Sequence, residues 1–579
     1  MSTQRKTPMG MTGRAVIIFL LLLALDWSGP VTVNEEIQPL SAVLIGILLL
    51  GIGAFLADFF RLLAVILEWF GTHLPTGKDG TARWARWKDL KGELSRKLQG
   101  PFWGLLAGRS AKPLFIDYVS NAMTLAPAGS GKGICTVIPD LFAIKESKVI
   151  GDFKGELLCV MKAPLETMGH SVRFLNPGGL WKEIVGEGDS YNPLDIIVDD
   201  LYRPGGLRDV PDDLRELAAQ ILPEPAETDG ENTYWREGSR RIIADAILIE
   251  AMVEEYDATL SSVALLIEDR EALEYNLRWL VGIDIEGKPL PDGPMPIEQA
   301  EWARKHEPED VAEFIQLVRA RATNLLALMG NGESRTFDSF VSGAQQALAP
   351  FAFGRLAPAM RRSTFSMNDL KEGDQATNLF IVADASRPEV YKNYIGLIQW
   401  CAMTAIKRHP DKDRPVYFIM DEATNYKVHG LESLLTWGRS YGLRLHLIFQ
   451  DLSAFERVYG KTALETLLSE TEIKQFLPGQ RSPKTLEMIS KLLGDQSVMA
   501  ASLSQHDGDV HEQMSEAARP LMTPDEIRRS SYGLLLVRRA PPALIEPISY
   551  AEIHPWRKQA GINPFHGKPF LRKVRIKLR

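Results

Sequence analysis

The chain has 579 residues, enough for several domains and one large buried core. Hydrophobic residues make up 45% and charged residues 24%, a balance that is typical of a globular protein and excludes wholesale disorder. The formal net charge of −8 argues against a protein that coats DNA by bulk electrostatics, so any contact with nucleic acid needs a local basic surface. The three cysteines form no close pair and no two histidines have the i, i+4 spacing of a helical metal site, so we expect reduced structural thiols and no structural metal.

Two uncharged apolar runs lie near the N-terminus, at Ala15–Leu25 and Ile37–Ala57, and Phe59–Phe70 extends the second. A helix that spans a bilayer needs ~20 apolar residues, a length that the second run reaches and the first does not. Lysines and arginines lie before the first run and after the second, with none between them. By the positive-inside rule we expect two transmembrane helices with both ends in the cytoplasm. A cleaved signal peptide is the alternative for the first run, although Asp26–Val33 lacks a convincing cleavage pattern.

The stretch Thr124–Asp140, TLAPAGSGKGICTVIPD, has the centre of a phosphate-binding loop. Leu114–Ala126 has the composition of a strand, and Gly131–Ala143 that of a helix which ends or bends at Pro139. Backbone N–H groups of such a loop bind phosphate oxygens, and Lys132 would reach the β- and γ-phosphates. The predicted nucleotide-binding residues are Ala126, Pro127, Ala128, Gly129, Ser130, Gly131, Lys132 and Gly133.

This loop departs from the usual pattern at both ends. Ala126 stands where a first glycine is usual, and Gly133 stands where a serine or threonine usually binds magnesium. A small residue suffices at the first position, but Gly133 offers no side-chain oxygen, and we leave Ser130 and Thr136 open as substitutes. The alternative is an ordinary Gly-rich turn between a strand and a helix.

An acidic pair far downstream is the second half of the predicted site. The apolar strand Val416–Met420 ends in Asp421 and Glu422, and the carboxyl ends of parallel strands are where α/β sheets bind ligands. Asp421 would hold Mg²⁺ through water, and Glu422 would polarise the attacking water. An acidic N-cap of the next helix is the alternative, but together with Lys132 we favour the catalytic role.

Two further candidates lie around the next strand, Leu443–Phe449. Gln450 follows at its tip, where a polar side chain can sense the γ-phosphate. Arg439, just upstream, is our candidate for an arginine that completes a neighbouring subunit's site in a ring-shaped motor. A surface salt bridge is the alternative for Arg439.

Helical periodicity replaces strand patterning from about Leu201 to Pro350. Apolar residues recur at i, i+3, i+4 and i+7 in Asp212–Leu222, Arg236–Tyr256 and Glu309–Met329, and strand patterning returns at Thr377–Ala385. The predicted fold class is therefore α/β, with a parallel sheet that is interrupted by a helical module. The domains that we expect are a membrane anchor at 1–72, a first motor part at 73–200, an inserted all-α domain at 201–350, a second motor part at 351–555 and a basic tail at 556–579.

The tail carries no acidic residue after Glu552, and Lys573–Arg579, KVRIKLR, alternates basic with apolar residues. As a strand it would show one cationic face. A surface for DNA or anionic lipid and a solvated tail are the alternatives, of which we favour the solvated tail.

Seven segments, in the same order along the chain, resemble the motifs of one family. They are Gly80–Leu90, Ala126–Leu141, Lys148–Leu157, the pair Phe174–Gly179 and Ser190–Asp195, Ile419–Tyr426, Gly438–Gly460 and Arg519–Arg529. On these segments the chain resembles the type IV secretion coupling proteins, the TraG-type family of conjugal DNA-transfer ATPases. A glycine after the loop lysine is normal in that family.

The resemblance implies a RecA-like P-loop motor domain with an inserted all-α domain and an N-terminal two-helix transmembrane anchor in the bacterial inner membrane. It implies ATP and Mg²⁺ as cofactors, and a homo-hexamer that moves single-stranded DNA with its relaxase, or effector proteins, into a type IV secretion channel. The expected partners are these substrates, channel subunits and inner-membrane lipids. A membrane-anchored receptor that binds nucleotide without hydrolysis is the alternative. A chromosome-partitioning DNA pump of the FtsK type shares the motor but usually has more spans and a winged-helix end.

Overall fold

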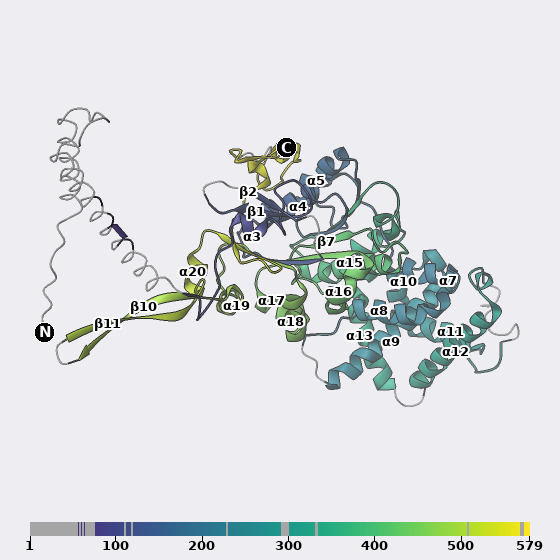
Figure 1. Ribbon diagram of the computed structural model, residues 1–579. Coiled ribbons are helices and arrows are strands. Elements are labelled where there is room, and N and C mark those ends of the chain that lie inside the picture. The colour runs from purple at the N-terminus through teal and green to yellow at the C-terminus, as the bar shows by residue number, and fades with distance from the viewer. Residues whose placement is uncertain are drawn as a thin grey trace, which may run out of the picture. The chain divides into compact units, whose positions relative to one another are not determined.

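The computed structural model describes most of the chain after residue 75 (Figure 1). The described ranges are 76–108, 112–116, 120–226, 230–290, 300–330, 334–506, 509–567 and 572–578, with isolated helical positions at Ile52, Leu56, Phe59, Phe60 and Leu63. The predicted transmembrane runs otherwise lie outside them. Within the described part, no helix combines the length and the apolar character that a membrane span requires.

The chain forms two compact units, of which the first combines residues up to Ala82 with Gly494–Leu521. Its described part is a two-stranded antiparallel ribbon, β10 (Asp495–His506) and β11 (Asp509–Pro520). The hydroxyl of Thr76 donates a hydrogen bond to the Glu516 carboxylate at 2.7 Å, so the segment before Arg83 is tied to the base of this ribbon.

The second unit, Arg83–Leu493 with Met522–Arg579, is built on an 11-stranded mixed sheet of order β2-β1-β13-β12-β9-β3-β8-β7-β4-β6-β5. The seven strands from β9 to β5 run parallel: β3 (Asn121–Leu125), β4 (Ser147–Asp152), β5 (Ser171–Leu175), β6 (Thr377–Val382), β7 (Val416–Met420), β8 (Leu443–Phe449) and β9 (Ile473–Phe476). β7 and β8 are buried along their whole length. Strands buried on both faces are largely apolar, as β7 is, and the polar residues Arg444 and His446 of β8 make hydrogen bonds.

Four antiparallel strands complete the sheet: β1 (Phe102–Leu106), β2 (Lys112–Phe115), β12 (Gly533–Val537) and β13 (Ala543–Glu546). The α/β class is thus confirmed, and the expectation of a parallel sheet describes only part of it. The expectation of one strand over Leu114–Ala126 is wrong, because this stretch contains the end of β2 and all of β3, which lie at different places in the sheet.

Of the two alternatives that the sequence left open at Pro139, an end of the helix there is wrong, because the helix continues to Ala143. Gly133–Val137 forms one π-helical turn, closed by the Ile138 N–H on the Gly133 carbonyl, and α4 (Ile138–Ala143) continues from it. Pro139 falls in the first turn of α4, where its missing N–H leaves no bond unmade.

Between β5 and β6 the described residues form helices and turns but no strand. The three segments predicted from periodicity correspond to α8 (Val210–Ile221), α9 (Gly230–Val253) and α12 (Pro308–Gly330). They lie with α7 (Asp195–Tyr202), α10 (Leu260–Glu268), α11 (Arg270–Val281) and α13 (Ser334–Ala352) in the lower right of Figure 1. These helices belong to the same compact unit as the sheet, and their status as a separate domain stays a prediction.

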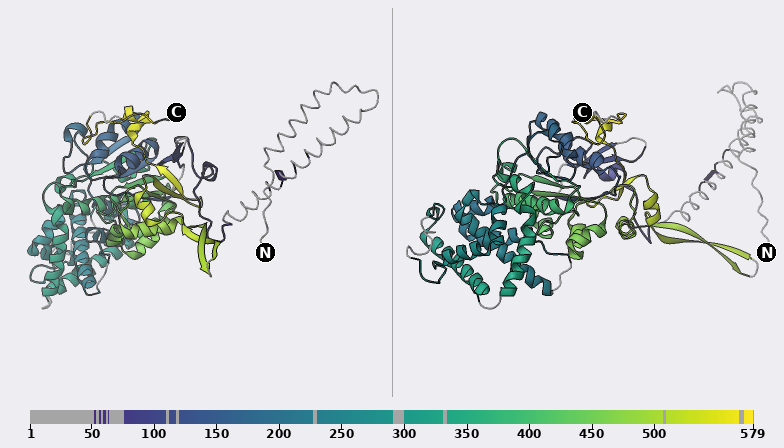
Figure 2. Two further views of the ribbon diagram at one scale, coloured as in Figure 1. Left: turned by 90° about the vertical axis from the view of Figure 1, so that its left-hand side faces the viewer. Right: turned by 180° about the vertical axis from the view of Figure 1, so that it is seen from behind.

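The chain end packs against α4 and α5 (Glu156–Thr167). Trp556, the first residue of α21 (Trp556–Gln559), is 2% exposed, and its ring stacks on Phe142 with centroids 5.5 Å apart. Both views of Figure 2 show the yellow C-terminal segment beside the blue part of the chain that contains these helices.

The last described residues include a short strand. β15 (Ile576–Lys577) pairs in parallel with β14 (Ile553–His554). Ile576 and Leu578 pack on the hydrophobic core, whereas the basic residues Lys573, Arg575 and Lys577 between the apolar positions are exposed. The basic residues of the tail therefore face solvent, and the choice between a solvated tail and a surface for DNA or anionic lipid stays a prediction.

Candidate functional site

The Gly-rich loop leaves the central strand β3 and enters the π-helical turn. The N–H of Ala126 donates to the carbonyl of Phe449 at 2.8 Å, which ties the start of the loop to the end of β8. The N–H of Ser130 donates to the carbonyl of Pro127 at 3.0 Å and closes a turn. The loop is therefore held at both sides by its own backbone and by the neighbouring strand.

Two glycines in this loop have a backbone that other residues rarely adopt. Gly129 and Gly131 both have φ of +80°. A Cβ built on Gly129 meets no atom within 4 Å, so conformation rather than crowding requires glycine there. The Oγ of Ser130 between them is buried and makes no hydrogen bond to any described residue. The loop thus presents an open cradle with an unpaired polar atom.

The structure brings Lys132 together with Asp421 and Glu422. The Nζ of Lys132 lies 3.1 Å from Asp421 Oδ1 and also forms an ion pair with Glu422. Burial alone would lower the pKa of Lys132, but the two carboxylates outweigh it and raise the pKa above its ordinary value. Burial also raises the pKa of Asp421, and Lys132 opposes this rise. The glycine turn and the acidic pair therefore belong to one site.

Glu422 occupies a turn directly after β7 with φ of +52°. A positive φ is uncommon for a residue with a side chain and occurs most often at functional positions. The amide of Gln450, at the tip of β8, donates to Glu422 Oε2 at 3.4 Å. The next helix, α16, begins only at Leu431 with Gly430 as its N-cap, so the acidic pair is not the cap of a helix.

Lys132, Asp421 and Glu422 line a cavity of about 450 Å³, which we call the Lys132 cavity, whereas Gln450 contacts Glu422 from outside the lining. Its walls come from the Gly-rich loop, the turn after β4, the acidic pair and the chain end. The lining residues without a predicted role include five with polar or charged side chains: Asp152, Lys154, Glu156, His566 and Arg572. Burial raises the pKa of the Asp152 carboxyl to about 7.

The chain end reaches this cavity through contacts between side chains and backbone that the sequence does not predict. Arg572 lies 3.7 Å from the Glu552 carboxylate, and the Arg557 guanidinium donates to the Arg572 carbonyl at 3.0 Å. The basic composition of the tail signalled its charge but not its location.

A buried polar network underlies the loop. The hydroxyl of Thr124 donates to Gln475 at 2.9 Å and shares a hydrogen bond with His446 at 2.8 Å. The other ring nitrogen of His446 lies 3.1 Å from Asp140 on α4. Thr136, one of the two magnesium-ligand substitutes that we left open, donates to Gln475 at 3.4 Å and so points into this network.

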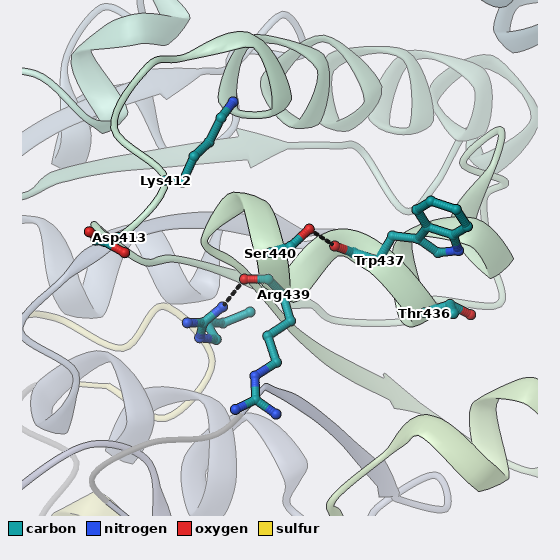
Figure 3. Close-up of a pocket in the computed structure, with 7 residues that line it drawn as sticks. Lys412, Asp413, Thr436, Trp437, Arg439 and Ser440 are labelled. Carbon is teal, nitrogen blue, oxygen red and sulfur yellow. Dashed lines mark hydrogen bonds between the residues drawn. The ribbon is translucent and has the colours of Figure 1, made fainter.

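Arg439 is not among the residues that line the Lys132 cavity. It borders a second cavity of about 700 Å³, together with Lys412, Asp413 and the exposed Trp437 (Figure 3). Its side chain is 60% exposed and lies 3.7 Å from Glu472. Within one copy of the chain, Arg439 thus takes part in a surface ion pair, and its predicted role in a neighbouring subunit stays a prediction.

With the fold and the cavity described, comparison with known proteins identifies the family. A family model described as type IV secretory system conjugative DNA transfer matches residues 79–550. The chain belongs to this family. Family resemblance extends to the VirD4 protein of Rhizobium rhizogenes, 25% identical over 81% of this chain and 65% of VirD4. The conjugal transfer protein TraG of Escherichia coli is 24% identical over 78% of this chain and 71% of TraG. The chain thus spans slightly less than two thirds of the VirD4 protein.

The coupling protein TrwB has a similar fold. Its unbound form lacking N-terminal residues, TrwBdeltaN70, matches with a TM-score of 0.54 at 17% identity, over 82% of this chain and 96% of that chain. TrwB in complex with the non-hydrolysable ATP analogue ADPNP matches with a TM-score of 0.53 at 18% identity, over 82% and 97%. At these identities the likeness concerns the fold alone, an α/β fold with a large mixed sheet.

Proposed function

We propose that this protein is an ATP-hydrolysing coupling protein. It recruits single-stranded DNA with its relaxase, or effector proteins, and drives their transfer into a type IV secretion channel. Membership of the conjugative DNA transfer family supports this proposal, as does the similarity to TrwB, one structure of which holds an ATP analogue. The observation that carries it is the meeting of Lys132 with Asp421 and Glu422 beside an open glycine loop.

The residues present fit a nucleoside triphosphate with Mg²⁺. The loop around Gly129 is open, the Ser130 hydroxyl is buried without a partner, and Lys132 holds a positive charge between two carboxylates. When bound, ATP with Mg²⁺ supplies a phosphoanhydride bond whose hydrolysis releases the energy for transport.

Each residue of the site then has a defined task. Backbone N–H groups of the loop would bind phosphate oxygens, and Lys132 would neutralise the terminal phosphates. Asp421 would hold Mg²⁺, and Glu422 would orient the attacking water and accept its proton. Gln450, already hydrogen-bonded to Glu422, senses the state of the γ-phosphate. These side chains are partly neutralised by one another, so the cavity is organised before it is filled.

The proposal extends to assembly and location. Arg439 is exposed and does not line the Lys132 cavity of its own chain, which suits a group that completes the site of a neighbour in a homo-hexamer. A two-helix anchor in the bacterial inner membrane, with the bulk of the chain in the cytoplasm, is proposed from the apolar runs and the distribution of basic residues near the N-terminus.

ATP hydrolysis by the full-length chain in detergent tests the proposal. We expect turnover that single-stranded DNA stimulates and that Lys132→Ala abolishes, because this change removes the only side-chain cation of the loop. A chain that binds ATP but does not hydrolyse it, with or without DNA, would contradict the proposal and support a receptor with a structural nucleotide site.

A further inference from the structure

With glycine at position 133, the proposed site lacks one of the usual oxygen ligands of Mg²⁺. The usual loop has a serine or threonine at this position, and its hydroxyl binds Mg²⁺. A Cβ built on Gly133 has one neighbour within 4 Å, the Oε2 atom of Glu156 at 3.9 Å. A carboxylate oxygen therefore lies next to the position that a side chain at Gly133 would occupy, at a distance that leaves room for a small side chain.

Glu156 begins helix α5, directly after the turn that follows β4, and it lines the Lys132 cavity. The side-chain amide of Asn563 donates to its Oε1 atom at 2.8 Å. With Oε1 engaged in this bond, Oε2 is the oxygen that faces Gly133. The two oxygens of this carboxylate thus have separate partners.

Asn563 is itself rigidly held. It is fully buried, and its carbonyl oxygen accepts the N–H groups of Phe565 and His566 at 3.0 and 3.1 Å. The preceding Gly561 donates its N–H to the carbonyl of Val160 on α5 at 2.8 Å. The chain end is therefore fixed to the same helix that carries Glu156.

We propose that Glu156 supplies the oxygen that binds Mg²⁺ in place of the absent hydroxyl, with Asn563 as its positioning residue. This inference rests on the proposed function, because it assumes that Mg²⁺-nucleotide occupies the Lys132 cavity. Carboxylate oxygens are preferred ligands of Mg²⁺. Thr136 is directed away into the core, and Glu156 lines the cavity together with Asp421.

The test measures how Mg²⁺ changes the affinity of the full-length chain for the fluorescent nucleotide MANT-ADP, by titration with Mg²⁺ or with EDTA. In the wild type, Mg²⁺ should tighten binding. In Glu156→Gln, the factor by which Mg²⁺ tightens MANT-ADP binding should be smaller by about tenfold or more, as expected when a metal site loses a carboxylate. Glu166→Gln, at an exposed carboxylate on the same helix, is the matched control and should keep the full gain. Asn563→Ala should lose part of it.

A second variant separates a metal ligand from a structural role. Gly133 does not have a positive φ and its Cβ direction is open, so a serine fits there. Gly133→Ser in the Glu156→Gln background should restore the Mg²⁺-dependent gain. A Glu156→Gln variant with the wild-type gain would overturn the inference, as would a double variant without recovery. A wild type that binds no MANT-ADP would instead refute the proposed function itself.

Discussion

Replacing Glu422 with glutamine tests the catalytic assignment with little disturbance of the fold. Glutamine has the same shape, it can keep the contact with Gln450, and it meets the same backbone strain at φ of +52°. Lys132 retains Asp421 at 3.1 Å. We therefore expect the free energy of unfolding to change by less than about 1 kcal/mol, as for substitutions that remove no packing.

The same change should strongly reduce hydrolysis. A general base contributes about 10²- to 10⁴-fold to the rate, which corresponds to about 3 to 5 kcal/mol of activation free energy. MANT-ATP affinity should stay equal or rise, because Glu422→Gln removes a negative charge beside the phosphates. Phosphate release and MANT-ATP titration on the full-length chain measure both quantities, with Glu432→Gln, on the exposed face of α16, as the control. A variant that retains more than about a tenth of the wild-type rate would refute the role of Glu422 as base.

Three further outcomes test other parts of the structure. Gly561→Ala places a Cβ 2.6 Å from the carbonyl oxygen of Cys159, so thermal unfolding should reveal a loss of about 1–3 kcal/mol; an unchanged midpoint would contradict the close packing of the chain end. Burial lowers the pKa of Lys148 to about 7, so between about pH 7 and pH 10 the folded chain binds fewer protons than the unfolded chain and its stability rises with pH. In Lys148→Met, the thermal midpoint should no longer rise with pH in this range. A dependence of the midpoint on pH equal to that of the wild type would contradict the assignment to Lys148. Arg439→Ala should leave MANT-ATP binding unchanged and lower the rate of hydrolysis by about 10³-fold or more. A variant with full activity would show that Arg439 serves only in a surface ion pair.

Sequence reasoning succeeded where the signal is contiguous. The predicted strand Val416–Met420 has the observed bounds, since a short run of five apolar residues before an acidic pair is typical of a buried strand in an α/β sheet. The Gly-rich loop was predicted for the same reason, because its glycines are required by local backbone conformation. Each of these two signals is contained within a few consecutive residues.

The remainder of the site depends on contacts between distant segments. Gly561 and Asn563 look unremarkable in the sequence, yet they fix the chain end against α5 and orient Glu156. A proline lacks an N–H, so the sequence predicts that the helix ends or bends at Pro139, whereas the structure has a π-helical turn before it and a helix that continues to Ala143. The antiparallel strands are hard to predict because β12 and β13 are short, and because β13 joins the sheet through β1, which lies far away in the chain.

The pairing of β1 with β13 constrains how the protein is made. Leu105 faces Glu546 in this ladder, so the two partners are separated by almost the whole chain. At about 5–20 residues per second, roughly 440 intervening residues take about 20 to 90 s to synthesise. During that time the backbone groups of β1 on this side have no strand to pair with, and an unpaired edge readily recruits strands of other nascent chains. Fragments for expression should therefore extend through Glu546, since a shorter fragment lacks β13 and leaves this edge of β1 unpaired.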